Sequence, residues 1–211
     1  MSERKVSIEK NRFYSFVRIL GKALSHTLIP VSYHGVENLP GSAPYVLMGN
    51  HNMALDPVFM AIAVDNAQVC FMAKKDLAKN KLAERFLIKL HCILVDRHKS
   101  DMEAMRNSTR VLKEGYILGI FPEGTRYHEG QMEQIEAGTA LLTMRARVPL
   151  VPMYYDRKIR LLHRTHCYIG EPIPYDDLLA EGINTESCEK LNERIRETYR
   201  GYQKEHPFQK K

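Results

Sequence analysis

Short apolar runs alternate with amphipathic segments along most of the chain, and this alternation limits the fold more than any other feature. Apolar runs of about four to eight residues are typical of buried strands, whereas apolar residues spaced by three and four indicate helices. We expect strands at residues 31–36, 45–49, 68–73, 92–95, 116–121, 148–155 and 166–169, and helices at residues 11–29, 58–64, 82–90, 101–114, 138–147 and 187–205. This order predicts a single α/β domain with a largely parallel central sheet flanked by helices.

The net charge of +6 belongs to the two ends of the chain. Residues 1–30 carry six Lys or Arg against two Glu, and residues 185–211 carry seven against five, which leaves residues 31–184 neutral. We therefore expect three parts: an N-terminal basic amphipathic helix within residues 1–30, the α/β domain over residues 31–184, and a C-terminal helix within residues 185–211 that packs on the domain.

The helix expected near the N-terminus combines an apolar stripe with a basic side. Arg12, Arg18 and Lys22 lie largely outside the stripe, which is formed by Phe13, Phe16, Val17, Leu20, Ala23, Leu24 and Leu28. The segment is too short and too charged to span a bilayer, which takes about 20 nearly uninterrupted apolar residues. Amphipathicity alone favours a helix packed on its own domain, but the charge concentrated at this end makes a helix that lies on a lipid surface an equal alternative.

Two further features concern the compartment. The first ten residues are charged, unlike a secretory signal peptide. The four cysteines form no C-x-x-C pair, and Cys70 and Cys92 lie inside apolar runs, as expected of buried, reduced thiols. Both features favour reducing, cytosolic conditions. Together with the N-terminal helix they predict a peripheral or monotopic protein on the cytoplasmic face of the cell membrane.

The loop at residues 50–57 is the first candidate for chemistry. It joins the strand at residues 45–49 to a helix in which Pro57 would be the first residue and Asp56 the N-cap. His51 and Asp56 cannot share a helical face at this spacing, but they can touch in a tight turn. A neutral imidazole can take a proton from an alcohol while a carboxylate fixes its tautomer. Taken alone, a capped helix beside an unrelated surface histidine is the simpler interpretation.

Two other turns follow predicted strands. Arg97 lies in a basic turn after the strand at residues 92–95. The turn after the strand at residues 116–121 contributes Glu123, Gly124, Thr125 and Arg126. Glycine permits a tight backbone and arginine a bidentate contact with phosphate, although solvated turns explain both segments equally well. Because sites in parallel sheets lie at the carboxyl ends of strands, His51, Arg97 and Glu123 are expected to converge. Pro149 and Pro152 in turn predict that residues 148–155 form an edge strand or a bent strand.

In this order, residues 50–56, the Arg97 region, residues 121–126 and residues 148–152 resemble the four motif blocks of the glycerolipid acyltransferases. The likeness is closest to the bacterial 1-acyl-sn-glycerol-3-phosphate acyltransferases and covers roughly residues 30–155. It implies that His51 is the general base and that Asp56 orients it. It also implies that the acceptor's phosphate and glycerol are bound by Arg97, Glu123, Gly124, Thr125 and Arg126. As an anion, Glu123 is expected to accept a hydroxyl or to position Arg126.

The resemblance implies transfer of a fatty acyl group from acyl carrier protein or coenzyme A to the sn-2 hydroxyl of 1-acyl-sn-glycerol 3-phosphate. The product would be phosphatidic acid, made at a surface with anionic lipids for phospholipid biosynthesis. The hydroxyl would attack the thioester directly, and the chain indeed contains no G-x-S-x-G segment. No metal, cofactor or nucleic acid is implied, and a metal hydrolase lacks support because no H-x-x-x-H or H-E-x-x-H spacing occurs.

Two alternatives stay open. The first is an acyltransferase for another acceptor, either glycerol 3-phosphate or a different lysolipid. The second is a non-catalytic protein that binds anionic lipid, which would not need the intact set of His51, Asp56, Glu123 and Arg126. Two departures from the family pattern bear on the acceptor. Met53 stands where many members carry serine, and Glu136-Ala137 precede Gly138 where a lysine-rich segment is common.

Overall fold

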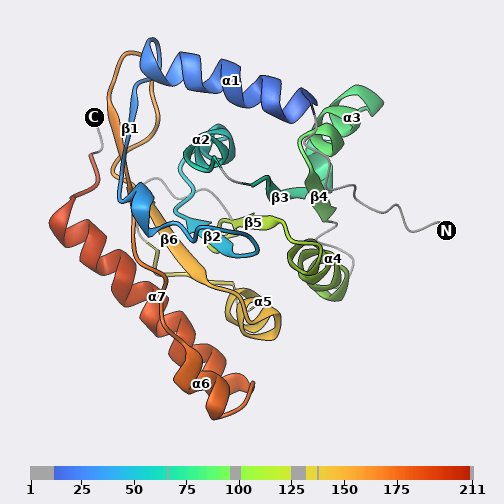
Figure 1. Ribbon diagram of the computed structural model, residues 1–211, viewed down its shortest axis with the longest axis vertical. Helices are drawn as coiled ribbons and strands as arrows, with labels where there is room; N and C mark the ends of the chain where they lie inside the picture. The colour runs from blue at the N-terminus through green and yellow to red at the C-terminus, as the bar shows by residue number, and fades with distance from the viewer. Residues whose placement is uncertain (1–11, 66, 96–100, 125–131, 137, 210–211) are drawn as a thin grey trace.

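One sheet organises the part of the chain that the computed structural model describes, namely residues 12–209 without residues 66, 96–100, 125–131 and 137 (Figure 1). Its strands are β1 (Val31–His34), β2 (Val46–Gly49), β3 (Val69–Lys74), β4 (Cys92–Val95), β5 (Ile117–Ile120), β6 (Leu150–Tyr155) and β7 (Thr165–Ile169). Their order is β1-β7-β6-β2-β5-β3-β4. Neighbouring strands are parallel except β6 and β7, which run antiparallel. The prediction of an α/β domain with a largely parallel sheet is confirmed.

Helices cover both faces of the sheet (Figure 1). They are α1 (Arg12–His26), α2 (Asp56–Ala63), α3 (Lys81–Lys89), α4 (Asp101–Lys113), α5 (Gly138–Ala146), α6 (Asp176–Ala180) and α7 (Thr185–Glu205). Alternate residues of each strand face opposite layers. In β2, Val46 and Met48 belong to the core shared with α4, α5, α6 and α7, whereas Leu47 belongs to the core shared with α1 and α2. The residues of β2 are thus buried under one or the other of two helical layers.

The long C-terminal helix α7 is fixed to the sheet by a buried stripe. Leu191, Ile195 and Tyr199 recur every four residues and are almost fully buried. Burial of each such side chain contributes about 1.5–3 kcal/mol to folding. The Tyr199 hydroxyl also donates to the carbonyl oxygens of Met48 (2.7 Å) and Met153 (3.2 Å). The helix therefore holds β2 and β6 together just before the loop that follows β2.

The strand expected around Pro149 and Pro152 is not at an edge, and as observed it begins at Leu150, after Pro149. β6 lies between β7 and β2, so the expectation of an edge strand is wrong. Pro152 is tolerated because its missing N–H would point toward β7 beyond the antiparallel register, which begins at Met153. Its carbonyl still accepts the Gly170 N–H at 3.0 Å. The short helix α6 and two 3-10 turns, Val36–Asn38 and Lys75–Leu77, were not expected because each is too short for a periodic signal.

Helix α1 packs on the domain through a face other than its apolar stripe. Tyr14, Gly21 and Ser25 are its buried residues. A Cβ on Gly21 would lie 2.7 Å from Ile62 Cδ1, so a larger residue would have to displace the end of the Ile62 side chain at this approach to α2. Phe16, Ile19 and Leu20 are instead 61%, 70% and 49% exposed. Among the described residues, no helix combines the length and apolar character needed to cross a bilayer.

Candidate active site

His51 and Asp56 come together in the loop between β2 and α2. His51 Nδ1 lies 3.0 Å from Asp56 Oδ2. The same oxygen accepts the backbone N–H groups of Asn52 (2.6 Å) and Met53 (2.7 Å). The carboxylate therefore turns back toward the loop, and α2 begins at Asp56 with Leu55 in the N-cap position and no side-chain cap. The expectation that Asp56 is the N-cap is wrong, because its oxygen already serves the loop.

This geometry sets the tautomer of His51. Since Asp56 Oδ2 accepts two backbone N–H groups, it also acts as the acceptor toward Nδ1, which carries the imidazole proton. The lone pair of the neutral ring then lies on Nε2. The ring stacks on Phe121 with centroids 4.4 Å apart, and the side chain is 17% exposed. The loop thus presents an oriented base that remains partly open to solvent.

Glu123 reaches the same histidine from the end of another strand. It follows β5, and its Oε2 accepts the backbone N–H of His51 at 2.8 Å. Only 5% of the residue is exposed. Burial raises the pKa of Glu123 to about 8, against the opposing effect of the His51 hydrogen bond and with a contribution from the negative charge of Asp56. The structure therefore brings together His51, Asp56 and Glu123, three of the residues expected at the site.

Gly124 allows the turn after Glu123 to close. Its φ of +62° lies in the left-handed region. A Cβ there would lie 2.2 Å from Glu136 Oε1, whose residue returns to the turn through a hydrogen bond from its N–H to the Pro122 carbonyl (2.8 Å). The expected site residues Arg97, Thr125 and Arg126 lie outside the described residues.

Two residues that support the site were not expected from the sequence. Asn50 is fully buried, accepts the Tyr155 N–H (2.8 Å) and donates to the Tyr155 carbonyl (3.0 Å). The Tyr155 hydroxyl in turn donates to the carbonyl oxygen of Asp56 at 3.2 Å. The end of β6 thereby fixes both ends of the loop that carries His51. The residues are 105 positions apart, so no local pattern connects them.

Several buried polar atoms near His51 have no hydrogen-bond partner among the described residues. They are Asn52 Oδ1, Asn52 Nδ2, Asp56 Oδ1 and Glu123 Oε1. Unpaired buried polar atoms are costly and uncommon, and they concentrate at functional sites or next to water. The Asn52 side chain is a further candidate that the sequence did not single out. Across the described part of the chain, no group of three or more His, Cys, Asp or Glu side chains is arranged to hold a metal.

A small apolar pocket adjoins this site between α1, α2, β3 and β4. Its lining includes Tyr14, Val17, Val58, Ala61 and Cys92. Two other lining residues connect it to the base. Pro57 directly follows Asp56, and the Phe71 ring lies 6.5 Å from the Phe121 ring that stacks on His51.

Comparisons with known proteins agree with the motif pattern. Residues 30–156 match the family model described as Acyltransferase. A 1-acyl-sn-glycerol-3-phosphate acyltransferase from Bacillus subtilis is 31% identical over 175 residues, which cover 79% of this chain and 87% of that protein. One from Streptococcus pneumoniae is 29% identical over 92% of this chain and 75% of its own. The crystal structure of the 1-acyl-sn-glycerophosphate acyltransferase from Thermotoga maritima superimposes with a TM-score of 0.69 at 20% identity, covering 98% of this chain and 86% of that one.

Proposed function

The chain belongs to the acyltransferase family, and we propose that it moves a fatty acyl group from a thioester to the sn-2 hydroxyl of 1-acyl-sn-glycerol 3-phosphate. The product is phosphatidic acid, the precursor of membrane phospholipids. The observation that carries the proposal is the 3.0 Å contact between His51 Nδ1 and Asp56 Oδ2, which leaves the Nε2 lone pair for the acceptor hydroxyl. The acceptor is inferred from the two bacterial relatives, which are 1-acyl-sn-glycerol-3-phosphate acyltransferases.

In the proposed reaction, His51 Nε2 removes the hydroxyl proton as the oxygen attacks the thioester carbonyl carbon. Asp56 stabilises the imidazolium that forms, as the carboxylate does in a Ser-His-Asp triad. When the carbon–sulfur bond breaks, the imidazolium returns the proton to the departing sulfur. The acyl group is then an ester of the acceptor, and the carrier leaves as a free thiol. No residue of the chain becomes acylated.

The surroundings of the base suit both substrates. The acceptor's phosphate and glycerol are bound by Glu123 and Gly124, which follow β5, together with Arg97, Thr125 and Arg126, which lie outside the described residues. The apolar pocket beside Pro57 and Phe71 lies next to the loop of the base, and its volume of about 50 Å³ accommodates only a short part of a hydrocarbon chain. The donor is a thioester of acyl carrier protein or coenzyme A, and no metal or cofactor takes part.

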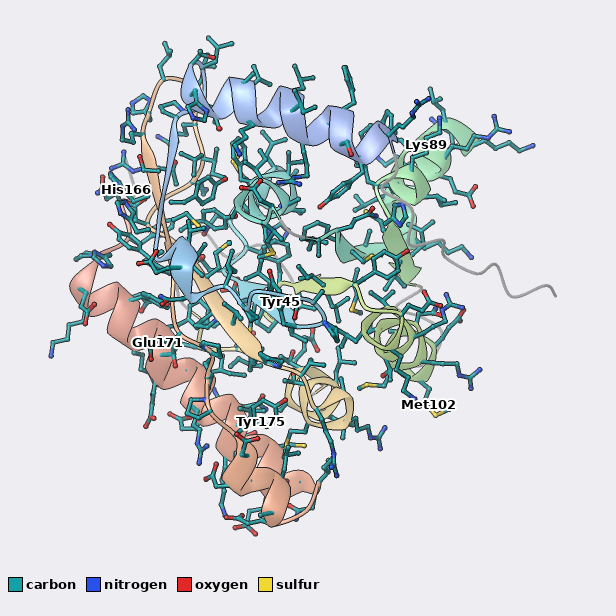
Figure 2. The ribbon with its side chains drawn as sticks, viewed as in Figure 1. Tyr45, Lys89, Met102, His166, Glu171 and Tyr175 are labelled. Carbon is teal, nitrogen blue, oxygen red and sulfur yellow. The ribbon has the colours of Figure 1, made fainter. Side chains whose placement is uncertain are left out.

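We place the protein at the surface of a membrane that contains anionic lipids, on its cytoplasmic face. The support comes from α1, whose residues Phe16, Ile19 and Leu20 face away from the domain. α3, whose last residue Lys89 is labelled in Figure 2, lies beside the first turn of α1. Phe13 of α1 contacts Phe86 of α3 with ring centroids 5.7 Å apart. None of the nine residues of α3 is buried. Two amphipathic helices with exposed apolar side chains fit an enzyme whose substrates are lipids.

The acceptor is tested with the purified full chain and a long-chain acyl thioester, offered in turn with lysophosphatidate, glycerol 3-phosphate and lysophosphatidylcholine. Products are identified by mass spectrometry. Phosphatidic acid from lysophosphatidate, with little product from the other acceptors, supports the proposal. A preference for glycerol 3-phosphate or another lysolipid assigns the other acceptor. Binding to anionic lipid without any acyl transfer supports the non-catalytic alternative. Parallel assays with acyl carrier protein and coenzyme A thioesters identify the donor.

A further inference from the structure

The loop between β6 and β7 combines exposed leucines with cations, and the proposed reaction gives it no role. Its residues 157–164, here called the basic loop, read Arg-Lys-Ile-Arg-Leu-Leu-His-Arg and contain no acid. Leu161 and Leu162 are 59% and 70% exposed at its tip. Ile159 is 2% exposed and anchors the loop in the core. Two adjacent leucines are therefore held out in solvent by a loop that is fixed at its base.

The backbone at the tip is held in a conformation that does not favour leucine. Leu162 has a φ of +57°, in the left-handed region that asparagine and glycine adopt far more readily. Its N–H donates to the Leu28 carbonyl at 2.7 Å, and the loop also closes through a bridge between Arg160 and His163. Neither burial nor backbone preference explains a leucine here. An apolar environment outside the chain would explain it.

The hydrogen bond to Leu28 places this tip at the end of α1. In Figure 1 the loop, drawn in orange, rises beside the C-terminal end of that helix. Leu28 itself is 47% exposed. Leu28 and the two leucines of the basic loop are thus neighbours at the C-terminal end of α1.

The charges of the basic loop remain available to a partner. Arg157 lies 3.8 Å from Asp156, and Arg164 donates to the Ser32 hydroxyl at 2.8 Å. Within the described residues, Lys158, Arg160 and Arg164 take part in no ion pair with a carboxylate. Exposed leucines next to uncompensated cations suit an anionic lipid surface, which takes up apolar side chains and attracts nearby Lys and Arg. A second copy of the chain fits poorly, because a two-fold contact would bring these cations together.

We infer that the basic loop is a second membrane-contact element, which inserts Leu161 and Leu162 into the lipid interface while Lys158, Arg160 and Arg164 contact anionic headgroups. The inference rests on the proposed membrane location and extends it to a segment about 130 positions from α1 in the sequence. With α1 it gives the domain two points of attachment, which restrict its rotation on the surface.

The experiment measures binding of the full chain to vesicles of phosphatidylcholine with and without phosphatidylglycerol. Binding is followed by flotation over a range of lipid-to-protein ratios. An apolar variant combines Leu161→Ser with Leu162→Asn, since asparagine tolerates the left-handed conformation. A charge variant combines Arg160→Gln with Arg164→Gln. We expect the apolar variant to bind about tenfold or more weakly to anionic vesicles. The charge variant should lose about fivefold for each cation on anionic vesicles and little on neutral ones.

Matched controls lie far from the basic loop. Ile183→Ser removes a 38% exposed apolar side chain beside α6, and Arg106→Gln with Lys113→Gln removes two exposed cations from α4. Both controls should bind like the wild type. Equal binding by the loop variants, or an equal loss in the controls, overturns the inference. The inference is also overturned if the wild type self-associates and the loop variants do not. It is overturned as well if the loop variants bind vesicles like the wild type but have a raised KM for the acyl carrier protein thioester.

The proposed activity is checked separately with short-chain lysophosphatidate below its micelle concentration. The loop variants should keep the wild-type kcat in that assay. If the wild type binds no vesicles but transfers acyl groups to this soluble acceptor, the membrane proposal and the inference fail while the proposed reaction stands. If the wild type binds vesicles and the loop variants bind equally well, the inference alone fails.

Discussion

Two buried carboxyl groups touch His51, and their surroundings differ. Asp56, the first residue of α2, receives three donors on one oxygen, including the imidazole itself. Glu123, in the turn after β5, receives one backbone N–H, and burial raises its pKa to about 8. The first environment supports a carboxylate that orients a base and balances the imidazolium charge. The second favours a protonated carboxyl group that holds the backbone of that base. Two acids of similar chemistry are thus assigned different tasks by the number of donors around them.

Replacing Asp56 by asparagine should have the largest effect. One oxygen, Asp56 Oδ2, faces the Asn52 N–H, the Met53 N–H and His51 Nδ1, so the two backbone donors keep the amide oxygen of asparagine at this position. The substitution therefore removes the negative charge that stabilises the imidazolium formed during proton transfer. We expect kcat to fall by about 10²–10⁴-fold, as losses of general-base catalysis do. Acyl-transfer kinetics measure this, and a denaturation curve verifies the fold. A loss below tenfold would place Asp56 outside the proton transfer.

Glu123→Gln tests the difference between Glu123 and Asp56 through the pH dependence of folding stability. The folded-state pKa of about 8 lies above the ordinary value of 4.5, so the folded protein holds the proton more tightly than the unfolded chain. Its contribution to stability is complete below about pH 4.5 and is lost as the pH rises toward 8. Glutamine keeps an oxygen for the His51 N–H without a charge to bury.

We expect the variant to gain roughly 2 kcal/mol or more over the wild type between pH 5 and pH 8.5. Urea denaturation of both proteins at several pH values measures the difference. Parallel stability curves across this range would show that Glu123 is ionised at neutral pH, and the contrast with Asp56 would disappear.

Gly124→Ala tests whether the turn after β5 depends on its backbone. Alanine at a φ of +62° should cost about 1–2 kcal/mol of stability and displace the Glu136 carboxylate. Gly182→Ala is the matched control, since it carries a φ of +89° and its Cβ would meet nothing within 4 Å. Both variants should lose similar stability by chemical denaturation. Only Gly124→Ala should raise KM for the acceptor. An equal KM for the acceptor in the Gly124→Ala and Gly182→Ala variants would show that the turn after β5 does not take part in acceptor binding.

Tyr155→Phe should have the smallest effect. It removes the hydroxyl that donates to the Asp56 carbonyl but keeps the ring and both backbone bonds to Asn50. The expected loss is about 1 kcal/mol of stability, with a severalfold decrease in kcat because the loop around the base becomes looser. Denaturation and steady-state kinetics of the same preparation measure both. A larger loss in kcat than in Asp56→Asn would reverse the order proposed for this loop.

Local sequence patterns predicted most of the helices and strands, but not which elements pack against one another. All seven strands were expected, because buried runs are recognised from a few adjacent residues. The central position of β6 was not, since it depends on where Pro152 meets the end of the β7 register. For α1, periodicity identified an apolar stripe but not which face packs. That choice depends on the close approach of Gly21 to Ile62, a contact between distant parts of the chain.

The site shows the same limit. The positions of His51 and Glu123 followed from strand ends and turn chemistry, whereas Asp56 was expected one position too early, as the N-cap of α2. The approach of Glu123 to the His51 backbone joins residues 72 positions apart, and the Asn50–Tyr155 pair joins residues 105 positions apart. Such contacts are set by strand order, which single-sequence periodicity does not contain. The roles of Arg97, Thr125 and Arg126 remain predictions from the motif pattern.

The most direct test of the account compares acyl transfer to lysophosphatidate by the wild type and by His51→Ala. His206→Ala, at the end of α7, is the matched control. Because His51 Nε2 is assigned as the general base, kcat of the first variant should fall by at least about 100-fold while its denaturation curve stays cooperative. The control should retain wild-type turnover. Unchanged turnover in a folded His51→Ala variant would contradict the mechanism proposed here.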